Sequence, residues 1–423
     1  MTADGSSATL VRSRPNPAAR RAITLLAAVV GLVGLAPVTP AVAASPVPPG
    51  YRLVASEALA PGVEHQTLHQ DRPAQSVHVA RLAPGMAGRL LPVLAHEVLT
   101  GPSSGVEPTS AMCTRVRCVA AVNGDFFDPA GHSIGAMVAG GELLATPGIE
   151  HILLRVDGQG RPTLRPGLDW GVAMATADGT TLPATTVNRP LNGEGITLYS
   201  RRWGPSTATD AAATEVLLRL PGAPNGVLPS GASAVAVGPA QAGGNLPIPA
   251  GHVVLSGRGA GARALAAMSQ RAGGSGVLHV AMEGIVSAIG GSPKLLENGK
   301  LAYPVDNPDG FTQHRHPRTA VGITPSGEML LVTADGRGAS GGLTLLEAAR
   351  LLAGLGAVEA MNLDGGGSTT FVTGGSVRNV PSGGSERGVA SALAVLAGGP
   401  PDPLAALLKQ VTDSVSGLLQ PAP

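Results

Sequence analysis

The sequence predicts an α+β protein: a single domain of mostly antiparallel sheets with a few packed helices. Its 423 residues include 60 glycines and 37 prolines, which favours short strands joined by many turns over long helices. Only 2% of the residues are aromatic, so the core must be built from Val, Leu, Ile and Ala. The chain is longer than the usual domain of about 100 to 200 residues, but one large domain with insertions can reach this length, and we expect a single catalytic domain.

Residues 1–44 differ from the rest of the chain and resemble a secretory signal peptide. Four arginines precede an uncharged apolar run at 22–36, which leads through prolines to small residues at 41–43. A spanning helix needs about 20 apolar residues, so this run fits a cleaved signal better than a membrane anchor. We expect a secreted or cell-envelope protein with no stable membrane anchor after cleavage. Arg20 and Arg21 leave the twin-arginine route open beside the general one.

The charge balance argues against nucleic acid as a partner. The chain carries 29 Lys and Arg against 28 Asp and Glu, and the signal removes four arginines and one aspartate. The mature chain is therefore close to neutral and has no basic stripe that would neutralise a run of phosphates.

Cys113 and Cys118 are the only two cysteines. Export places them in an oxidising compartment, so we expect a disulfide between them. The alternative is a reactive or metal-binding thiol pair, but no third or fourth ligand follows at the spacing of a zinc site.

We expect an N-terminal lead-in and the first strands over 45–110, with further strands after them. Residues 45 to about 75 are polar and contain prolines, so we expect them to cover the surface, whereas 76–94 are apolar and strand-like. The segment 118–124 (CVAAVNG) predicts a buried strand, and 135–144 a hairpin that turns at two glycines, 140 and 141. Further short strands are expected over 155–276.

A strong hairpin signal lies at residues 318–334. The runs RTAVGI and EMLLVTADG flank a turn of Pro, Ser and Gly. Counting back from a three-residue loop pairs Thr324 with Glu328 and Arg318 with Ala334. This register places Arg318 beside Asp335 at the open end of the hairpin, although a slip by one residue stays open.

A helix is expected next, over Leu345 to Leu355. Thr344 and Glu347 fit a capping box, in which each side chain bonds to a free backbone amide of the first turn. A core strand follows at 358–363, and TTFV resumes the sheet after three glycines. The last segment, 399–423, predicts a linker and an amphipathic helix or tail, which either packs on the domain or binds a partner.

The motif NLDGGGSTT, at 362–370, is the most specific signal in the chain. Gly365, Gly366 and Gly367 remove every Cβ from a strand-to-strand turn, so a ligand can approach the backbone amides closely. Polar side chains flank the glycines, namely Asn362, Asp364, Ser368 and Thr369. The alternative is a tight hairpin in which the glycines only supply positive φ angles.

Several ordered blocks resemble the phosphodiester glycosidase family. RTAVGI, TADGR, GLTLLEAARLLAGLGAVEAMNLDGGGSTTFV and ERGVASALAV follow one another over 318–395. VNGDFF at 122–127 and IGGSPKLLENGK at 289–300 resemble earlier blocks of the family. We therefore assign the phosphodiester glycosidase domain, a single catalytic domain, to 111–398. The resemblance implies hydrolysis of a sugar that is linked through its anomeric carbon to a phosphodiester.

The resemblance also implies the site residues. The positions that match the family's motifs are Arg318, Asp335, Asn362, Asp364, the glycines 365–367 and Arg387. Cleavage at an anomeric carbon passes through an oxocarbenium-like state, so Asp335 and Asp364 are expected as catalytic carboxylates, with Arg318 beside them. Because a phosphodiester leaving group is a weak base, the larger demand falls on cations, and Arg318, Arg337 and Arg387 can bind its oxygens bidentately.

Other polar residues near the motifs are weaker candidates. Substrate contacts are expected from Asn123, Gly124 and Asp125, and from His316, which is either a proton donor or an ordinary surface histidine. Asp125 and Asp128 do not have the spacing of a twelve-residue calcium loop, so no obligatory metal or other cofactor is expected, with calcium as the alternative. Glu283 and Glu386 are candidates for a second acid/base group.

Two rival functions remain open from the sequence. One is an exported glycosidase that acts on envelope polysaccharide without phosphate in the bond. The other is a non-catalytic protein of glycan binding or exopolysaccharide assembly that uses the same pocket. The expected partner is therefore a carbohydrate phosphodiester or an envelope glycan.

Overall fold

The computed structural model describes residues 46–100, 105–220, 228, 234–272, 276–282, 284–302 and 313–398. Strands dominate this part of the chain, and nearly all of their pairings are antiparallel, the exception being β12 with β13. The α-helices within it are α1 (Thr109–Val116), α2 (Ala260–Ala272) and α4 (Leu345–Gly354). The fold is thus the predicted mixture of antiparallel sheets and a few helices, with the sheets in the majority. The predicted signal peptide and the tail at 399–423 lie outside the described residues, and the domain bounds stay a prediction.

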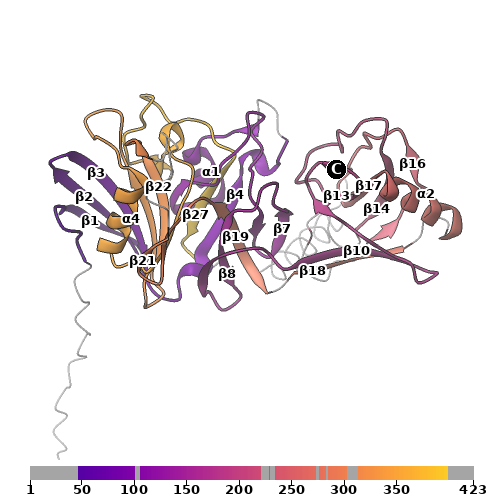
Figure 1. Ribbon diagram of the computed structural model, residues 1–423, viewed down its shortest axis with the longest axis horizontal. Helices are drawn as coiled ribbons and strands as arrows, with labels where there is room; N and C mark the ends of the chain where they lie inside the picture. Colours follow the sequence, from indigo (N-terminus) through magenta and orange to yellow (C-terminus); the bar gives the residue numbers. More distant parts are fainter. Residues whose placement is uncertain are drawn as a thin grey trace, which may run out of the picture. The chain divides into compact units, whose positions relative to one another are not determined.

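The largest sheet of the site region has eight strands. Their order across the sheet is β1 (Arg52–Ala60), β2 (Val63–Asp71), β3 (Ala74–Leu82), β23 (Met329–Ala334), β22 (Arg318–Ile323), β24 (Glu359–Asn362), β20 (Lys294–Glu297) and β21 (Lys300–Leu301). Figure 1 shows this sheet with α4 on it.

Two five-stranded sheets accompany it. The first has the order β26 (Ser376–Val377), β25 (Phe371–Thr373), β5 (Cys118–Asn123), β27 (Ser391–Leu396) and β4 (Leu90–Leu94). The second has the order β7 (Glu142–Ala145), β6 (Met137–Ala139), β19 (Ile285–Gly291), β8 (Ile152–Asp157) and β9 (Pro162–Pro166).

A fourth sheet, of nine strands, is built mostly from residues 170–282. Its path is β11 (Thr181–Pro183), β10 (Trp170–Thr176), β18 (Gly276–Met282), β15 (Val235–Ala236), β14 (Thr214–Arg219), β17 (His252–Arg258), β13 (Gly195–Tyr199) and β12 (Thr186–Val187), with β16 (Gln241–Ala242) paired to β14. Helix α2 packs on this sheet, with Leu265 and Met268 in its apolar core. The short 3-10 helices are η1 (Ala87–Arg89), η2 (Ala95–Glu97) and η4 (Gly366–Ser368).

The site region is layered as helix, sheet, sheet, helix. One apolar cluster joins the inner faces of the eight-stranded sheet and the sheet of β5, with Val321 and Met361 on one side and Val122 and Phe371 on the other. Side chains of α4 cover the outer face of the eight-stranded sheet. Those of α1 cover the outer face of the other sheet. The strand ends of the two sheets therefore meet at a common edge.

The local predictions around the hairpin are confirmed. Arg318 pairs with Ala334, and the Thr324 amide donates to the Glu328 carbonyl at 3.0 Å, so the register is the one predicted. The capping box of Thr344 and Glu347 is present at the start of α4. The two-glycine hairpin also forms, with β6 and β7 joined at 140–141, where both glycines have positive φ. That conformation suits the right-handed twist of the strands.

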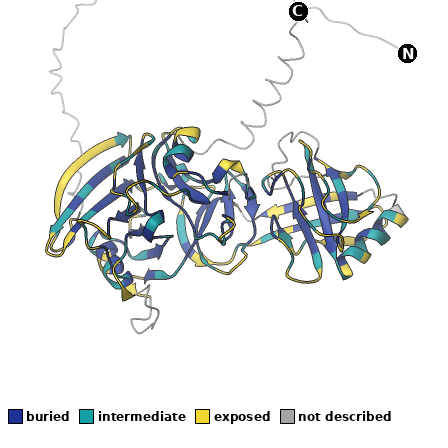
Figure 2. Ribbon diagram, turned by 90° about the horizontal axis from the view of Figure 1, so that it is seen from above, coloured by how far each residue is buried: buried dark blue, intermediate teal, exposed yellow. Residues whose placement is uncertain are grey.

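The N-terminal part of the described chain pairs into the large sheet. Residues 45 to about 75, expected as a surface lead-in, instead form β1 and β2, two full strands of the large sheet. Strand β1 is exposed along most of its length at the sheet edge, so it lies on the surface; Figure 2 colours the described residues by burial. Its pairing with β2 is interrupted by two irregularities, which bend an edge strand.

The predicted disulfide between Cys113 and Cys118 is present. It joins α1 to the first residue of β5. Within the described residues, no helix is long and apolar enough to span a bilayer.

Candidate functional site

Asn123, the last residue of β5, joins the two sheets at the common edge. Its Oδ1 accepts hydrogen bonds from the Thr319 hydroxyl at 2.7 Å and from the Thr370 amide at 3.2 Å. Its Nδ2 donates to the Asp364 carbonyl at 2.7 Å. The Asn123 side chain is buried, and buried polar atoms such as its Oδ1 and Nδ2 need hydrogen-bond partners. Asn123 therefore holds the glycine turn in place, and this role explains its position without a contact to substrate.

The glycine turn lies against two arginines. The Gly366 amide donates to the Pro317 carbonyl at 2.8 Å, and Gly366 has a φ of +61°, which favours glycine. A Cβ at Gly366 would lie 3.2 Å from Nη2 of Arg337, and one at Gly367 would lie 3.4 Å from Nη1 of Arg387. The missing side chains thus allow two guanidinium groups to approach the backbone.

Asp364 lies beside one of these guanidinium groups. Its Oδ2 accepts a hydrogen bond from the Ser368 hydroxyl and lies 3.4 Å from Nη2 of Arg387. Burial raises the pKa of Asp364, and the negative charge of Asp125 adds to this rise, whereas the Ser368 hydrogen bond and the Arg387 charge lower the pKa. Burial prevails, so Asp364 binds its proton more tightly than an ordinary aspartate.

The two guanidinium groups remain accessible. Arg387 is 51% exposed in its side chain and has its Cζ 5.4 Å from the centre of the Phe127 ring. Arg337 is also exposed, and its Nη2 lies 3.1 Å from Nδ1 of His316. Burial lowers the pKa of His316, and the charges of Arg318 and Arg337 lower it further. The imidazole is therefore neutral at neutral pH, and Arg337 and Arg387 supply the positive charge here.

Arg318, predicted to act beside the carboxylates, contacts the backbone. Its guanidinium is buried, and Nε donates to the Leu343 carbonyl at 2.9 Å, while Nη2 donates to the His314 carbonyl at 3.1 Å. These bonds hold the chain that leads into β22. A contact between Arg318 and a phosphate stays a prediction.

Asp335 lies at the same edge but has different partners from Asp364. Its Oδ1 accepts hydrogen bonds from Nδ2 of Asn379 and from the Val380 amide, both at 3.1 Å. Asn379 also donates to the Thr369 carbonyl at 3.1 Å, so Asp335 is connected to the glycine turn through one amide side chain. Burial raises the pKa of Asp335, and its two hydrogen bonds oppose the rise. Its direct part in catalysis stays a prediction.

Asp125 and Asp128 hold loop backbone. Asp125 accepts from the amides of Phe126 and Gly135 at 2.8 Å and lies 3.3 Å from Nδ1 of His151. Asp128 accepts from the amides of Ala130 and His132. No group of three or more His, Cys, Asp or Glu side chains in the described residues is placed to bind a metal ion. The prediction that no metal is required remains to be tested by experiment.

The remaining predicted residues lie around the same turn. The Gly124 amide donates to the Ser391 carbonyl at 2.8 Å, and its own carbonyl accepts from the Asp364 amide at 3.2 Å. Nδ2 of Asn362 donates to the Ser292 carbonyl at 2.8 Å. Ser368 and Thr369 are buried. Glu283, a candidate acid/base group, lies outside the described residues.

Two residues at the site had no predicted role. Asn379 links Asp335 to the glycine turn, and Phe127 lies under Arg387. Phe127 belongs to the quoted block NGDFF, so its position was visible in the sequence but its contact was not. Asn379 is an isolated polar residue after β26, and nothing in its local pattern indicates the buried bonds that it makes.

Part of the chain is similar to known proteins. Residues 221–396 match the family model for phosphodiester glycosidase. The N-acetylglucosamine-1-phosphodiester alpha-N-acetylglucosaminidase of Mus musculus is 48% identical over 72 residues, which cover 17% of this chain and 14% of that protein. The Homo sapiens protein of the same name is 45% identical over 65 residues, 15% of this chain and 13% of that protein. The matches therefore span only a small part of these relatives.

Solved structures share the fold over a larger part of the chain. A hypothetical protein from Synechocystis has a TM-score of 0.60 and 22% identity, covering 82% of this chain and 68% of that one. An exported-protein candidate from Burkholderia pseudomallei K96243 has a TM-score of 0.57 and 26% identity, covering 76% of this chain and 74% of that one. Arg318, Asp335, the glycine turn and Arg387 all lie within the region that matches the family model. Residues 221–396 of this chain are therefore similar to the phosphodiester glycosidase family.

Proposed function

We propose that this protein is a hydrolase that cleaves a sugar from a glycosyl-1-phosphodiester. The observation that carries the proposal is the partly buried carboxylate of Asp364 beside Arg387, next to a glycine turn that Arg337 also approaches. A carboxylate and two accessible guanidinium groups are the chemistry that this substrate needs. The curated relatives named for a phosphodiester substrate support the same class.

The reaction divides between these groups. Water forms a bond from its oxygen to the anomeric carbon, and the bond from that carbon to the phosphate oxygen breaks. The electron pair leaves with the phosphate, as a phosphomonoester, and the water proton passes to solvent or a base. Asp364 stabilises the positive charge that develops on the sugar ring. Arg337 and Arg387 hold the phosphate oxygens, where the negative charge increases.

This division explains why the strongest requirement is for cations. A departing phosphate needs little help from a general acid, in contrast to a sugar alkoxide. A glycosidase that cleaves a neutral polysaccharide would gain little from two arginines at its glycine turn. The geometry therefore favours a phosphodiester substrate over a polysaccharide without phosphate in the bond.

A paired substrate screen tests the proposal. The mature protein is incubated with sugar-1-phosphodiesters and with neutral glycosides of the same sugars, and free sugar is measured. We expect release from the phosphodiesters. Release from the neutral glycosides alone would replace the proposal with the polysaccharide rival, and glycan binding without any release would support a non-catalytic role.

Substitution of Asp364 is the matching test on the protein. Asp364→Asn keeps the shape of the side chain and removes its charge, so kcat should decrease by about 10²- to 10⁴-fold. Asp71→Asn is the control: it removes an exposed carboxylate at the end of β2 and should keep the wild-type kcat. Wild-type turnover in Asp364→Asn at an unchanged melting temperature would exclude Asp364 from the mechanism.

We also propose that the protein is exported. The arginines and apolar run before residue 44 support this, and so does the likeness to the Burkholderia structure, whose description is that of an exported protein. Cell fractionation followed by N-terminal sequencing tests it. A mature chain that begins after Ala43 outside the cytoplasm is expected, and an intact N-terminus in the cytoplasm would contradict export.

A further inference from the structure

Arg387 lies on a segment that no strand holds. It follows β26 and precedes β27, and its side chain is half exposed. A long side chain in such a segment has many conformations, and holding it in one of them costs conformational entropy. The segment must therefore be fixed by its neighbours if Arg387 is to present its guanidinium beside Asp364.

The neighbour on one side is the first turn of α1. Both carboxylate oxygens of Glu386 are engaged by Ser110: Oε2 accepts from the Ser110 amide at 3.0 Å, and Oε1 accepts from the Ser110 hydroxyl. Ser110 is the second residue of α1. Backbone amides in a first helical turn have no partner within the helix, and a negative charge there is favourable. Glu386 thus anchors the segment on a helix that is itself buried against the sheet.

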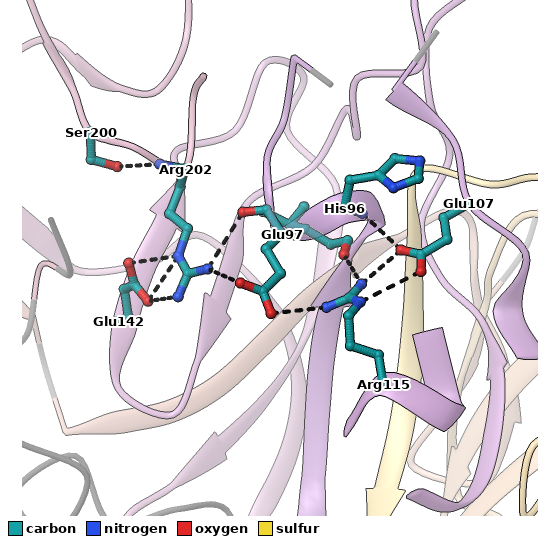
Figure 3. Close-up of polar contacts among 8 residues, drawn as sticks. His96, Glu97, Glu107, Arg115, Glu142, Ser200 and Arg202 are labelled. Atoms are coloured by element: carbon teal, nitrogen blue, oxygen red, sulfur yellow. Dashed lines mark hydrogen bonds and ion pairs between the residues drawn. The ribbon is translucent and has the colours of Figure 1, made fainter. Parts of the chain in front are cut away.

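The neighbour on the other side is the chain that leads into α1. Glu107 and Val389 exchange two backbone hydrogen bonds, both at 3.0 Å. The Glu107 carboxylate is in turn held by Arg115 at 2.7 Å and by the His96 amide at 2.7 Å, as Figure 3 shows. Arg387 therefore lies between two attachments: Glu386 bonds to the first turn of α1, and Val389 bonds to Glu107, just before α1.

Figure 3 also shows how far this support extends. Arg115 contacts Glu97 at 3.3 Å, and Arg202 contacts Glu97 at 3.7 Å and Glu142 at 2.9 Å. Alternating charges thus run from Glu142 on β7 to Glu107. The attachment at Val389 is part of this network, whereas the attachment at Glu386 depends on Ser110.

We infer that Glu386, through Ser110, is a positioning residue that holds Arg387 at the phosphate subsite. The inference rests on the proposed function, because it assigns a purpose to the orientation of Arg387. It also gives Glu386 a different part from that of a second acid/base group, since Ser110 engages both of its oxygens.

A double-mutant cycle tests the inference, with kcat/KM measured on a sugar-1-phosphodiester. Glu386→Ala should lower kcat/KM about tenfold, through both KM and kcat, because Arg387 contacts the phosphate in the bound substrate and as its negative charge increases. In an Arg387→Ala background the same substitution should change kcat/KM less than about twofold, because the residue that it positions is gone. Additive losses would overturn the inference.

The Gln variant separates positioning from proton transfer. Gln can still accept from the Ser110 amide and donate to the Ser110 hydroxyl, so Glu386→Gln should keep kcat/KM within about threefold of wild type. A loss in Glu386→Gln as large as that in Glu386→Ala, with a changed pH profile, would instead make Glu386 an acid/base group.

Glu215→Ala is the matched control for structural damage. Glu215 accepts from a backbone amide, that of Leu246, and from the Thr209 hydroxyl, both at 2.8 Å, and it lies on β14. The Glu215→Ala variant should have a lower melting temperature but should not show the tenfold loss in kcat/KM. If Arg387→Ala itself has no effect, the proposed function is wrong at this subsite; if it has a large effect and Glu386→Ala has none, only the positioning inference fails.

Discussion

Neighbouring groups shift the pKa of the Asp364 carboxyl in opposite directions. Burial and Asp125 raise its pKa, whereas Ser368 and Arg387 lower it, and the net shift is upward. A carboxylate that stabilises a cationic sugar ring must be ionised. Activity should therefore decrease as the pH falls through this raised pKa, and the acid limb of the pH profile reports on the state of Asp364.

Arg387→Ala should move that acid limb to higher pH. The substitution removes a positive charge that lowers the pKa of Asp364, so the carboxyl protonates earlier as the solution is acidified. The measurement is kcat/KM from acidic to neutral pH. Arg387→Lys keeps the charge and should leave the limb closer to its wild-type position. An acid limb that stays in place, or moves to lower pH, would contradict the assignment to Asp364.

At the scale of residues, the candidate site residues that stand in consecutive motifs could be named from the sequence, and their roles stay predictions. The glycine turn with Asp364 and the block around Arg387 were recognisable, and the structure brings them together. Asn379 and Ser110 were missed because their roles depend on partners far along the chain, 44 residues away for Asp335 and 276 for Glu386. A local pattern does not contain such contacts.

Elements with local signals were predicted well, and those with distant ones were not. The capping box and the β22–β23 hairpin involve residues a few positions apart, so their bounds and register followed from the sequence. Helix α2 was missed within a stretch expected to hold strands. Its first amide, that of Ala260, donates to the carboxylate of Glu194, 66 residues earlier, so no capping residue is adjacent.

Strands β1 and β2 show a related limit. Prediction of a strand depends on an apolar face, and β1 has none because most of its residues are exposed at the edge of the sheet. Strand β2 is buried in part, but its polar residues, such as His65 and Gln66, are buried with it. The hydrogen-bonded ladder with β3 forms this pair, and the side-chain pattern does not reveal it.

The capping box at α4 is open to a direct test of stability. The Thr344 hydroxyl accepts from the Glu347 amide at 3.1 Å, and the Thr344 amide donates to the Glu347 carboxylate at 2.9 Å. Thr344→Ala removes the first bond and should lower the free energy of unfolding by about 1 kcal/mol. Urea denaturation measures it. Thr344→Ser keeps a hydroxyl and should lose much less; equal losses in the two variants would mean that the methyl packing matters more than the cap.

At the scale of the molecule, two buried histidines connect two of its sheets. His65 and His78, from the eight-stranded sheet, stack with Phe371 of β25, with ring centres 4.9 Å and 5.5 Å from it. The two imidazoles also contact each other, with Nε2 of His65 3.1 Å from Nδ1 of His78. Burial lowers the pKa of His78 to about 4, with further lowering from the charges of His65 and Arg378. The core therefore holds these rings in the neutral form.

This pair should make the fold sensitive to acid. His78 is protonated below its ordinary pKa of 6.5 in the unfolded chain but only near about 4 in the folded one. Its contribution to stability is therefore complete above 6.5 and is lost progressively as the pH falls from 6.5 to about 4, by up to about 3 kcal/mol. Urea unfolding at several pH values measures the slope. His78→Leu should flatten the slope, and His252→Leu, at a partly exposed histidine that begins β17, should not. Equal slopes in all three proteins would refute the assignment.

At this scale the sequence predicts the class of the fold but not its layers. The preference for short antiparallel strands follows from glycine, proline and aliphatic residues. The pairing of β3 with β23, and of β5 with β27, joins segments that lie far apart in the chain, and many alternative partners have similar patterns. Which sheets form, and which faces pack together, is decided by the complete set of contacts.

The bridge that Asn123 makes between the sheets has a kinetic consequence. One amide group bonds to Thr319 of the first sheet, Thr370 before β25 and the Asp364 backbone, so the glycine turn is held on both sheets only when all three bonds have formed. A refolding chain with one sheet assembled would already show the circular dichroism of strands and yet lack the proposed activity. Turnover is thus a late reporter of folding in this protein, and its recovery should lag behind the spectroscopic signal.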